Sequence, residues 1–309
     1  MRRPVPGMIA ALLLVLLVAP GVAQAGRVLL KKAFIEKYKN RATIELQFAI
    51  DHAHKKPNAV KDNGDDGDLH MSGRALKAGL PMVAEIVNAA KAPQKNALAL
   101  VKANEGNDAE VTLKGVWRLW FEHPSSELQK QFDPVPKPKD TNPKHVFEVH
   151  PITGIDTNEI LTSFVPIEGF RAYNAQTAFP YYENLSLTVQ SDDSGVKLVS
   201  PQSRYNYAEF WIELTQKPVK RQDGYTVMAI VKDAEGTPRT PGPRRMVFVE
   251  GTKSAEKVKT LKKGDEMHVL GIPRINLFEI AEIAKTAGAH GKKTNLPYEM
   301  IIVAQLPDE

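Results

Sequence analysis

Cysteine is absent from the 309 residues. The chain therefore cannot form disulfides, cannot use a cysteine nucleophile and cannot carry a lipid on an N-terminal cysteine. Long apolar runs are also scarce, because the run Ile9 to Ala19 has 11 residues and a membrane-spanning helix needs about 20. Removing Arg2 and Arg3 leaves 39 basic residues against 36 acidic ones. This small excess gives no argument for nucleic acid as a partner.

The first 25 residues have the pattern of a secretory signal peptide. A positively charged start precedes the apolar run, and Ala23-Gln24-Ala25 forms a small-residue cleavage site. Pro20 and Gly21 end the apolar run early, which argues against an uncleaved membrane anchor. We therefore expect cleavage before Gly26, with no membrane span left in the mature chain. The expected location is periplasmic or extracellular.

Residues 26–156 show the alternation of apolar and polar side chains that half-buried strands have. It is clearest where Ile44, Leu46 and Phe48 alternate with polar residues. The predicted elements are strands at 42–51, 68–74, 82–87, 110–123 and 146–152, with a helix at 93–104. Three strands, a helix and two strands is the element order of the five-stranded Greek-key barrel known as the OB-fold.

The same order of elements returns in residues 204–309. The predicted elements there are strands at 205–215, 225–231, 245–249, 267–273 and 298–304, with helices at 254–261 and 277–285. Residues 157–203 contain the turn sequence Ser191 to Gly195 and are expected to be a hairpin-containing connector that packs on the second half. The predicted fold is mainly β, a β-rich α+β fold with tandem five-stranded OB-like barrels joined by this connector.

Two of the predicted strands carry the most chemically capable side chains. Asp68, His70 and Arg74 share one face of the strand 68–74, and Glu148 and His150 share one face of the strand 146–152. If these strands lie near one another, the five side chains form one patch on the exposed face of the barrel. They are the candidate ligand-binding residues.

The same segments carry a family resemblance. Gly67-Asp68-Leu69-His70, Met82-Val83-Ala84-Glu85 and Phe147-Glu148-Val149-His150-Pro151 are similar to the G-D-x-H and E-x-H-P motifs of a family of uncharacterised exported bacterial proteins. The resemblance covers residues 42–156 and does not extend into the second half. It implies an exported bacterial protein with an OB-like fold, and it implies no particular activity.

A divalent metal is one ligand that the patch could bind, although the sequence predicts no cofactor outright. Imidazole and carboxylate ligands at i and i+2 of a strand lie on one face, and the candidate metal ligands are His52, His54, Asp68, His70 and His150. The competing interpretation is a solvated acidic loop, with His70 and Glu148 paired to Arg74. It is favoured because no compact motif such as H-E-x-x-H is present.

A polyanion, including nucleic acid, or an oligosaccharide is the other kind of ligand. Aromatic and basic side chains that could form an OB-type binding groove are Lys114, Arg118, Trp120, Tyr205, Tyr207 and Trp211. Charges of both signs are interspersed along the chain, however, and Trp117 and Trp211 are expected in the core. A serine nucleophile in G-x-S-x-G is missing. The sequence thus favours an exported binding or interaction module of unknown ligand over its alternative, a metal-dependent hydrolase using Asp68, His70, Glu148 and His150.

Overall fold

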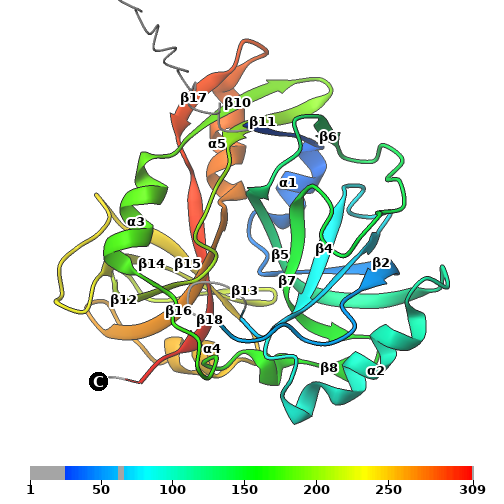
Figure 1. Ribbon diagram of the computed structural model, residues 1–309. Helices are drawn as coiled ribbons and strands as arrows, with labels where there is room; N and C mark the ends of the chain where they lie inside the picture. Colours follow the sequence, from blue (N-terminus) through cyan, green and yellow to red (C-terminus); the bar gives the residue numbers. More distant parts are fainter. Residues whose placement is uncertain (1–24, 62–65, 308–309) are drawn as a thin grey trace, which may run out of the picture.

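The computed structural model describes residues 25–61 and 66–307, so the predicted signal peptide lies outside the described residues except for Ala25. Strands dominate these residues, and each of the two halves closes into a barrel (Figure 1). Within the described ranges, none of the helices has both the length and the apolar character needed to cross a bilayer.

The first barrel has the topology that the order of its elements predicts. Its strands are β2 (Thr43–Ala53), β3 (Leu69–Arg74), β4 (Met82–Ile86), β5 (Glu110–His123) and β7 (His145–Ile155). Antiparallel pairs join β3 to β2 and β4, and join β5 to β2 and β7, while a parallel pair of β4 with β7 closes the barrel. The helix α2 (Lys95–Asn104) lies between the third and fourth strands of the barrel and buries Ala97 and Val101.

The close contact of β5 with β7 depends on Gly115. A Cβ atom at this position would lie 2.4 Å from a methyl group of Val149 and 2.8 Å from the carbonyl oxygen of Pro151. The register between the two strands shifts at the same point, so the missing side chain lets the long strand β5 bend around the barrel.

The second barrel repeats this topology. Its strands are β12 (Ala208–Leu214), β14 (Gly224–Lys232), β15 (Arg244–Val249), β16 (Glu266–Ile275) and β18 (Tyr298–Gln305), with the short β9 (Tyr173–Asn174) and β13 (Val219–Arg221) at the edges. A parallel pair of β15 with β18 closes it, as β4 with β7 closes the first. The helices α4 (Lys253–Val258) and α5 (Leu277–Ala287) follow β15 and β16. The predicted tandem of OB-like barrels is therefore confirmed.

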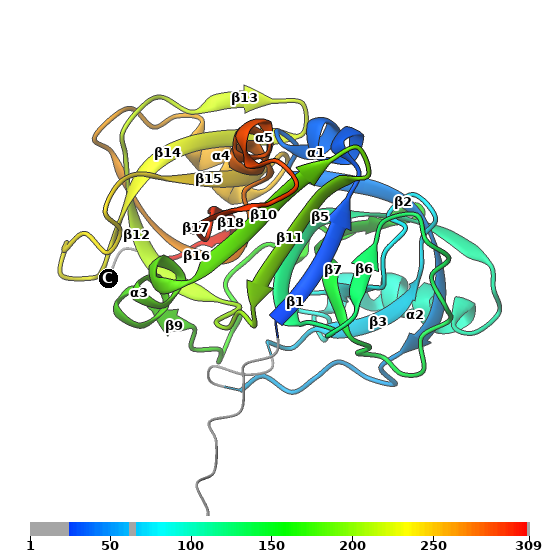
Figure 2. The same ribbon diagram turned by 90° about the horizontal axis from the view of Figure 1, so that it is seen from above.

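A third sheet, which the sequence pattern did not predict, connects the two barrels. Its order is β17 (Lys292–Asn295), β10 (Ser186–Asp192), β11 (Gly195–Pro201), β1 (Ala25–Leu30) and β6 (Leu128–Lys130). The hairpin β10–β11 is confirmed, but it pairs with the N-terminal strand β1 as well as with β17 of the second half (Figure 2). The helix α1 (Lys32–Tyr38) contacts α5 beside this sheet.

The first part of the connector contains a helix that the sequence pattern did not predict. After β8 (Asn158–Glu159) and a turn at Leu161–Ser163, α3 (Ala175–Asn184) begins at Asn174, whose side chain accepts a hydrogen bond from the Thr177 N–H. Phe179 and Tyr182 are buried on its inner face. Pro180 lies inside the helix, at a position where proline removes one backbone hydrogen bond.

The barrels are held together by buried polar contacts. The Arg274 guanidinium of β16 lies 3.6 Å from the centre of the Trp117 ring of β5 and donates hydrogen bonds to the carbonyl oxygens of Arg41, Ala42 and Trp117. Its Nε is 2.7 Å from Oε1 of the buried Glu299. The second barrel therefore inserts one cation into the wall of the first.

Asp223, in the turn between β13 and β14, makes a second connection. Its carboxylate accepts hydrogen bonds from the backbone N–H groups of Ala42 and Thr43, from the Thr43 hydroxyl and from the Arg41 guanidinium, at 2.7–3.0 Å. Partial burial acts to raise the pKa of Asp223, but these hydrogen bonds outweigh it and lower the pKa below its ordinary value.

Replacing Asp223 with alanine is expected to lower the free energy of unfolding by about 1–3 kcal/mol at pH 7, because buried N–H groups lose their acceptor. Since the folded pKa lies below the unfolded one, the contribution of Asp223 is present above about pH 4 and is lost as the pH falls further. Urea unfolding at pH 7 and pH 3 measures this, and Asp193→Ala in the exposed β10–β11 turn is the control. A deficit at pH 3 as large as the one at pH 7 would contradict the assignment.

Candidate functional site

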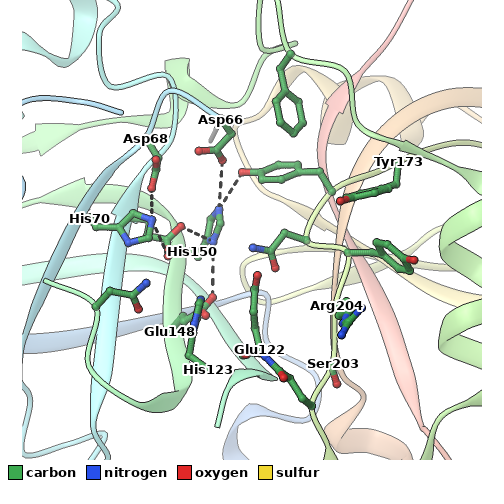
Figure 3. A pocket seen from close by; sticks show the side chains of 17 residues that line it. Asp66, Asp68, His70, Glu122, His123, Glu148, His150, Tyr173, Ser203 and Arg204 are labelled. Carbon is green, nitrogen blue, oxygen red and sulfur yellow. Dashed lines mark hydrogen bonds and ion pairs between the residues drawn. The ribbon is translucent and has the colours of Figure 1, made fainter. Parts of the chain in front are cut away.

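A cavity of about 670 Å³ lies between the outer wall of the first barrel and the segment that leads into the second barrel. Acidic and histidine side chains from the first barrel form one wall, and Phe170, Tyr173 and residues 202–207 form the other (Figure 3). Asp68, His70, Glu148 and His150 all line this cavity. Two stretches about eighty residues apart in the sequence therefore meet in one place.

Strand pairing explains why these side chains meet. In β3 and β4, His70 lies opposite Glu85; in β4 and β7, Val83 lies opposite Glu148; and in β5 and β7, Arg118 lies opposite Glu148. Because side chains alternate along each strand, the polar residues face outward while their apolar neighbours fill the barrel. The strand β4 thus lies between the two strands that carry the candidate residues.

The charged side chains form two groups that share Glu85. In the first group, His70 Nε2 forms an ion pair with Asp68 and lies 3.5 Å from Glu85 Oε1. In the second, His150 Nδ1 lies 2.8 Å from Glu85 Oε2 and 3.6 Å from Glu148 Oε2. In each group, one ligand-type atom from every member lies within 4.8 Å of the others. The two oxygens of Glu85 therefore face different groups.

Neighbouring residues fix the positions of these side chains. Glu148 accepts hydrogen bonds from the buried Arg118 and, at 3.0 Å, from His145 Nε2. The Tyr207 hydroxyl lies 2.9 Å from His150 Nε2, and the Asn58 side chain donates to Asp68 at 2.9 Å. Such supporting hydrogen bonds hold reactive groups in one geometry.

Electrostatics shift the pKa values of the first group strongly. Burial acts to raise the pKa of Asp68, but His70 and Asn58 outweigh it and bring this pKa to about 2. Burial acts to lower the pKa of His70, but the carboxylates of Glu85 and Asp68 raise it to about 10. Burial and the charge of Asp68 raise the pKa of Asp66 to about 7.

The second group behaves in the same way. Burial opposes the charged form of Glu85, but the two imidazoles beside it keep its pKa below the ordinary value. Glu148 has a pKa well below the ordinary value because Arg118 outweighs its burial. The carboxylates of Glu85 and Glu148 raise the pKa of His150 well above the ordinary value, again against burial. Without another cation, the two protonated imidazoles and the Arg118 guanidinium therefore balance the three carboxylates at neutral pH.

Arg74 is not part of this cluster, and its inclusion in the candidate site was wrong. Its guanidinium binds Asp51 through two hydrogen bonds and also binds Asp108. Arg74 shares a strand face with His70, as predicted, but lies four residues further along β3, a distance of about 13 Å in a strand. It is therefore at the other end of the barrel. The suggested pairing of His70 and Glu148 with Arg74 is wrong for the same reason.

His52 and His54 have other neighbours than the metal-ligand hypothesis expected. His52 Nε2 lies 3.0 Å from the carbonyl oxygen of Pro138, away from the two groups. The His54 ring stacks on His70 with ring centres 5.1 Å apart. His54 therefore borders the first group, while His52 lies outside it.

The patch is also buried rather than exposed. Asp68, Glu148 and His150 are each at most 2% exposed. The outward face of a strand shows the same alternation of apolar and polar residues whether it is exposed to water or covered by another part of the chain. The alternation therefore did not predict that this face is buried. On the other side of the cavity lie residues of the connector and of the segment that leads into the second barrel, among them Tyr173, Ser203 and Arg204 (Figure 3).

The proposed groove for polyanions is not formed. Trp120 and Arg118 are completely buried and Tyr207 is nearly so. Lys114 lies on the surface beside Glu45, away from the cavity. Trp117 is in the core as expected, but Trp211 is only half buried and stacks on His268.

Three residues of the site were missed by the sequence analysis as members of the candidate set. Glu85 is a lone acid in an otherwise apolar strand, and Asp66 lies two residues before Asp68. Both signals were visible in the sequence. Tyr207 comes from the connector side, and only its position in the fold assigns it to this site.

Comparisons with known proteins add little to this geometry. No family model and no curated protein matches the chain. One similar solved structure is that of a murine DNA-binding protein bound with double-stranded DNA; the alignment covers 84% of this chain and 92% of that chain, with 10% identity and a TM-score of 0.20. A likeness at this level carries no argument. The OB-like topology is therefore assigned from the strand pairing, and the candidate site is assigned from the geometry of its side chains.

Proposed function

We propose that this cavity is a divalent-metal centre and that the protein is an exported metal-dependent hydrolase. The observation that carries the proposal is the sharing of Glu85 between two groups of carboxylate and imidazole ligands. Each oxygen of Glu85 faces a different histidine, so this one carboxylate could bridge two ions. Sites with bridged metal pairs are common in enzymes that activate water.

The donor atoms suit a divalent metal of intermediate hardness. Mixed imidazole and carboxylate ligands suit Zn²⁺ or Mn²⁺, and ligand atoms a few ångströms apart can reach one ion with bonds of about 2 Å. Asp68 Oδ2 and His150 Nδ1 are buried and make no well-formed hydrogen bond within the described residues, although both lie at ion-pair distance from a charged neighbour. A cation bound between such groups would satisfy them.

The position of the cluster supports hydrolysis rather than a purely structural metal. The ligands line a cavity that is large enough for a small substrate, and a metal there would lower the pKa of a bound water. Arg118 and His145 hold Glu148 in place, and Tyr207 holds His150. These residues would fix the ligand geometry while the cavity admits the substrate.

Dialysis against EDTA followed by calorimetric titration with ZnCl₂ or MnCl₂ tests the metal centre. We expect about one to two equivalents to bind. Turnover of p-nitrophenyl acetate should appear with the bound metal and disappear with EDTA. Absence of binding would overturn the metal centre, and binding without turnover would overturn the assignment as a hydrolase.

A metal-free binding pocket is the second candidate. The ion pairs of His70 with Asp68 and of His150 with Glu85 favour it, because they neutralise the carboxylates with protons alone. It would correspond to the binding module that the sequence favours. The EDTA-treated protein would then bind its ligand unchanged, and added metal would have no effect.

Metal affinity is expected to rise with pH. Both imidazoles have raised pKa values, about 10 for His70, so they are protonated at pH 7 and must lose their protons before they can bind a metal. Each displaced proton makes the affinity increase about tenfold per pH unit between pH 6 and pH 8. Calorimetry in two buffers of different ionisation enthalpy measures the protons released; a release of none would contradict direct binding by His70 and His150.

A further inference from the structure

The cavity has two chemically different walls. The first-barrel wall carries the acidic and histidine side chains, whereas Tyr173 lies on the opposite wall (Figure 3). The cavity is also lined by Tyr205, whose ring contacts Tyr173, and by the contacting rings of Phe170 and Tyr207. A ligand that fills the space must therefore satisfy polar groups on one side and a continuous aromatic surface on the other.

The aromatic wall is rigid. The Tyr173 and Tyr205 rings are 4.4 Å apart between centres, and Tyr181 packs against Tyr205 from another side at 4.8 Å. Tyr205 has φ of 64°, a left-handed backbone conformation that is uncommon for a bulky residue. The buried Tyr182 hydroxyl donates to the Tyr205 carbonyl oxygen at 2.6 Å and holds this conformation. The chain thus fixes a tyrosine ring at the cavity at some energetic cost.

The charge of the lining argues against a polyanion. The lining contains five carboxylates and one arginine, Arg204, besides its histidines; the carboxylates belong to Asp66, Asp68, Glu85, Glu122 and Glu148. This lining offers little positive charge to an anionic polymer, because the imidazoles of His70 and His150 are already paired with carboxylates. The remaining polar lining includes the amides of Asn142, Gln202 and Asn206, which can both donate and accept hydrogen bonds.

A small organic cation is also disfavoured. The buried Arg118 guanidinium and the two imidazoles already neutralise much of the carboxylate charge, and any bound metal would complete this. Amides and carboxylates that are already paired are better suited to hydroxyl groups, which donate and accept at once. A ligand with many hydroxyl groups and an apolar face matches both walls.

We infer that the cavity binds a neutral carbohydrate. One sugar ring would pack its C–H face on Tyr205 and Tyr173, and its hydroxyl groups would bond to the amides and to the carboxylate wall. The inference rests on the proposed function in that it assigns the substrate class of the same cavity. It requires the aromatic wall, and it holds whether or not a metal is bound.

Saturation-transfer NMR with maltotriose, cellotriose, xylotriose and triacetylchitotriose tests this inference on the wild-type protein, before and after EDTA treatment. At least one trisaccharide should bind, and Tyr205→Ala should weaken it about tenfold or more because the stacking surface is lost. Tyr225→Ala is the matched control, since Tyr225 lies in the second barrel with Lys220 over its ring.

The outcomes separate this inference from the metal proposal. Metal binding with no trisaccharide binding would overturn the carbohydrate assignment alone, and the reverse result would overturn the metal centre alone. Binding that Tyr205→Ala leaves unchanged would also overturn the carbohydrate assignment. So would a preference for spermidine, or a salt-sensitive preference for single-stranded DNA, because each identifies a charged ligand class.

Discussion

Replacement of Glu85 with glutamine is expected to abolish divalent metal binding, with an apparent Kd at least about 100-fold higher than in the wild type. The amide keeps the size of the side chain but removes the charge and one oxygen that the two groups share. Because Glu85 contacts both His70 and His150, a single substitution should affect both groups together. Calorimetric titration with ZnCl₂ and MnCl₂ measures the effect.

Glu209→Gln is the matched control for this experiment. Glu209 also pairs with an imidazole, because its Oε1 lies 3.1 Å from His268 Nε2, but it is on the second barrel outside the cavity. The control should bind metal like the wild type. Circular dichroism and thermal unfolding of both variants show whether the fold is retained. A folded Glu85→Gln protein with unchanged affinity would remove the basis of the shared-ligand model.

Arg274→Met is expected to lower the free energy of unfolding by about 3–5 kcal/mol. The substitution leaves the carboxylate of Glu299 buried without its closest cation and removes three hydrogen bonds to carbonyl oxygens of the first barrel. Arg245 remains 3.3 Å from Glu299 and offsets only part of this loss. Urea unfolding followed by tryptophan fluorescence measures the change, since Arg274 packs directly on Trp117.

Two further variants separate the ion pair from its burial. The double variant Arg274→Met/Glu299→Leu should recover part of the lost stability, because no buried charge is then left unpaired. Lys285→Met, which breaks the pair with Glu282 at the surface, should cost about 1 kcal/mol or less. Equal effects for the surface and the buried pair would contradict the role of Arg274 in joining the barrels.

The fold could be predicted from the sequence largely because alternation is a local signal. The strand β5 was predicted with the bounds that the structure shows, since Val111, Leu113 and Trp117 mark the buried face of a long strand. The third sheet could not be predicted in this way. Its hairpin β10–β11 was predicted, but β1, β6 and β17 are short strands whose partners in the sheet are distant in the sequence.

The site could be predicted only in part, for a related reason. The alternation of side chains placed His70, Glu148 and His150 on the correct face of their strands. It does not give the position of a residue along a strand, and Arg74 was therefore included in the candidate site. Glu85 was missed as a ligand because β4 reads as a fully buried strand, and all five of its residues are buried. The closed barrel, rather than the local sequence, places it between the two histidines.

Anomalous diffraction from crystals soaked in MnCl₂ or ZnCl₂ tests the central claim most directly. A metal centre built on Glu85 predicts one or two anomalous peaks beside this residue, each within about 2–2.5 Å of a carboxylate oxygen and of an imidazole nitrogen of His70 or His150. Crystals with no peak in the cavity, while Glu85 keeps its ion pair with His150, would contradict it.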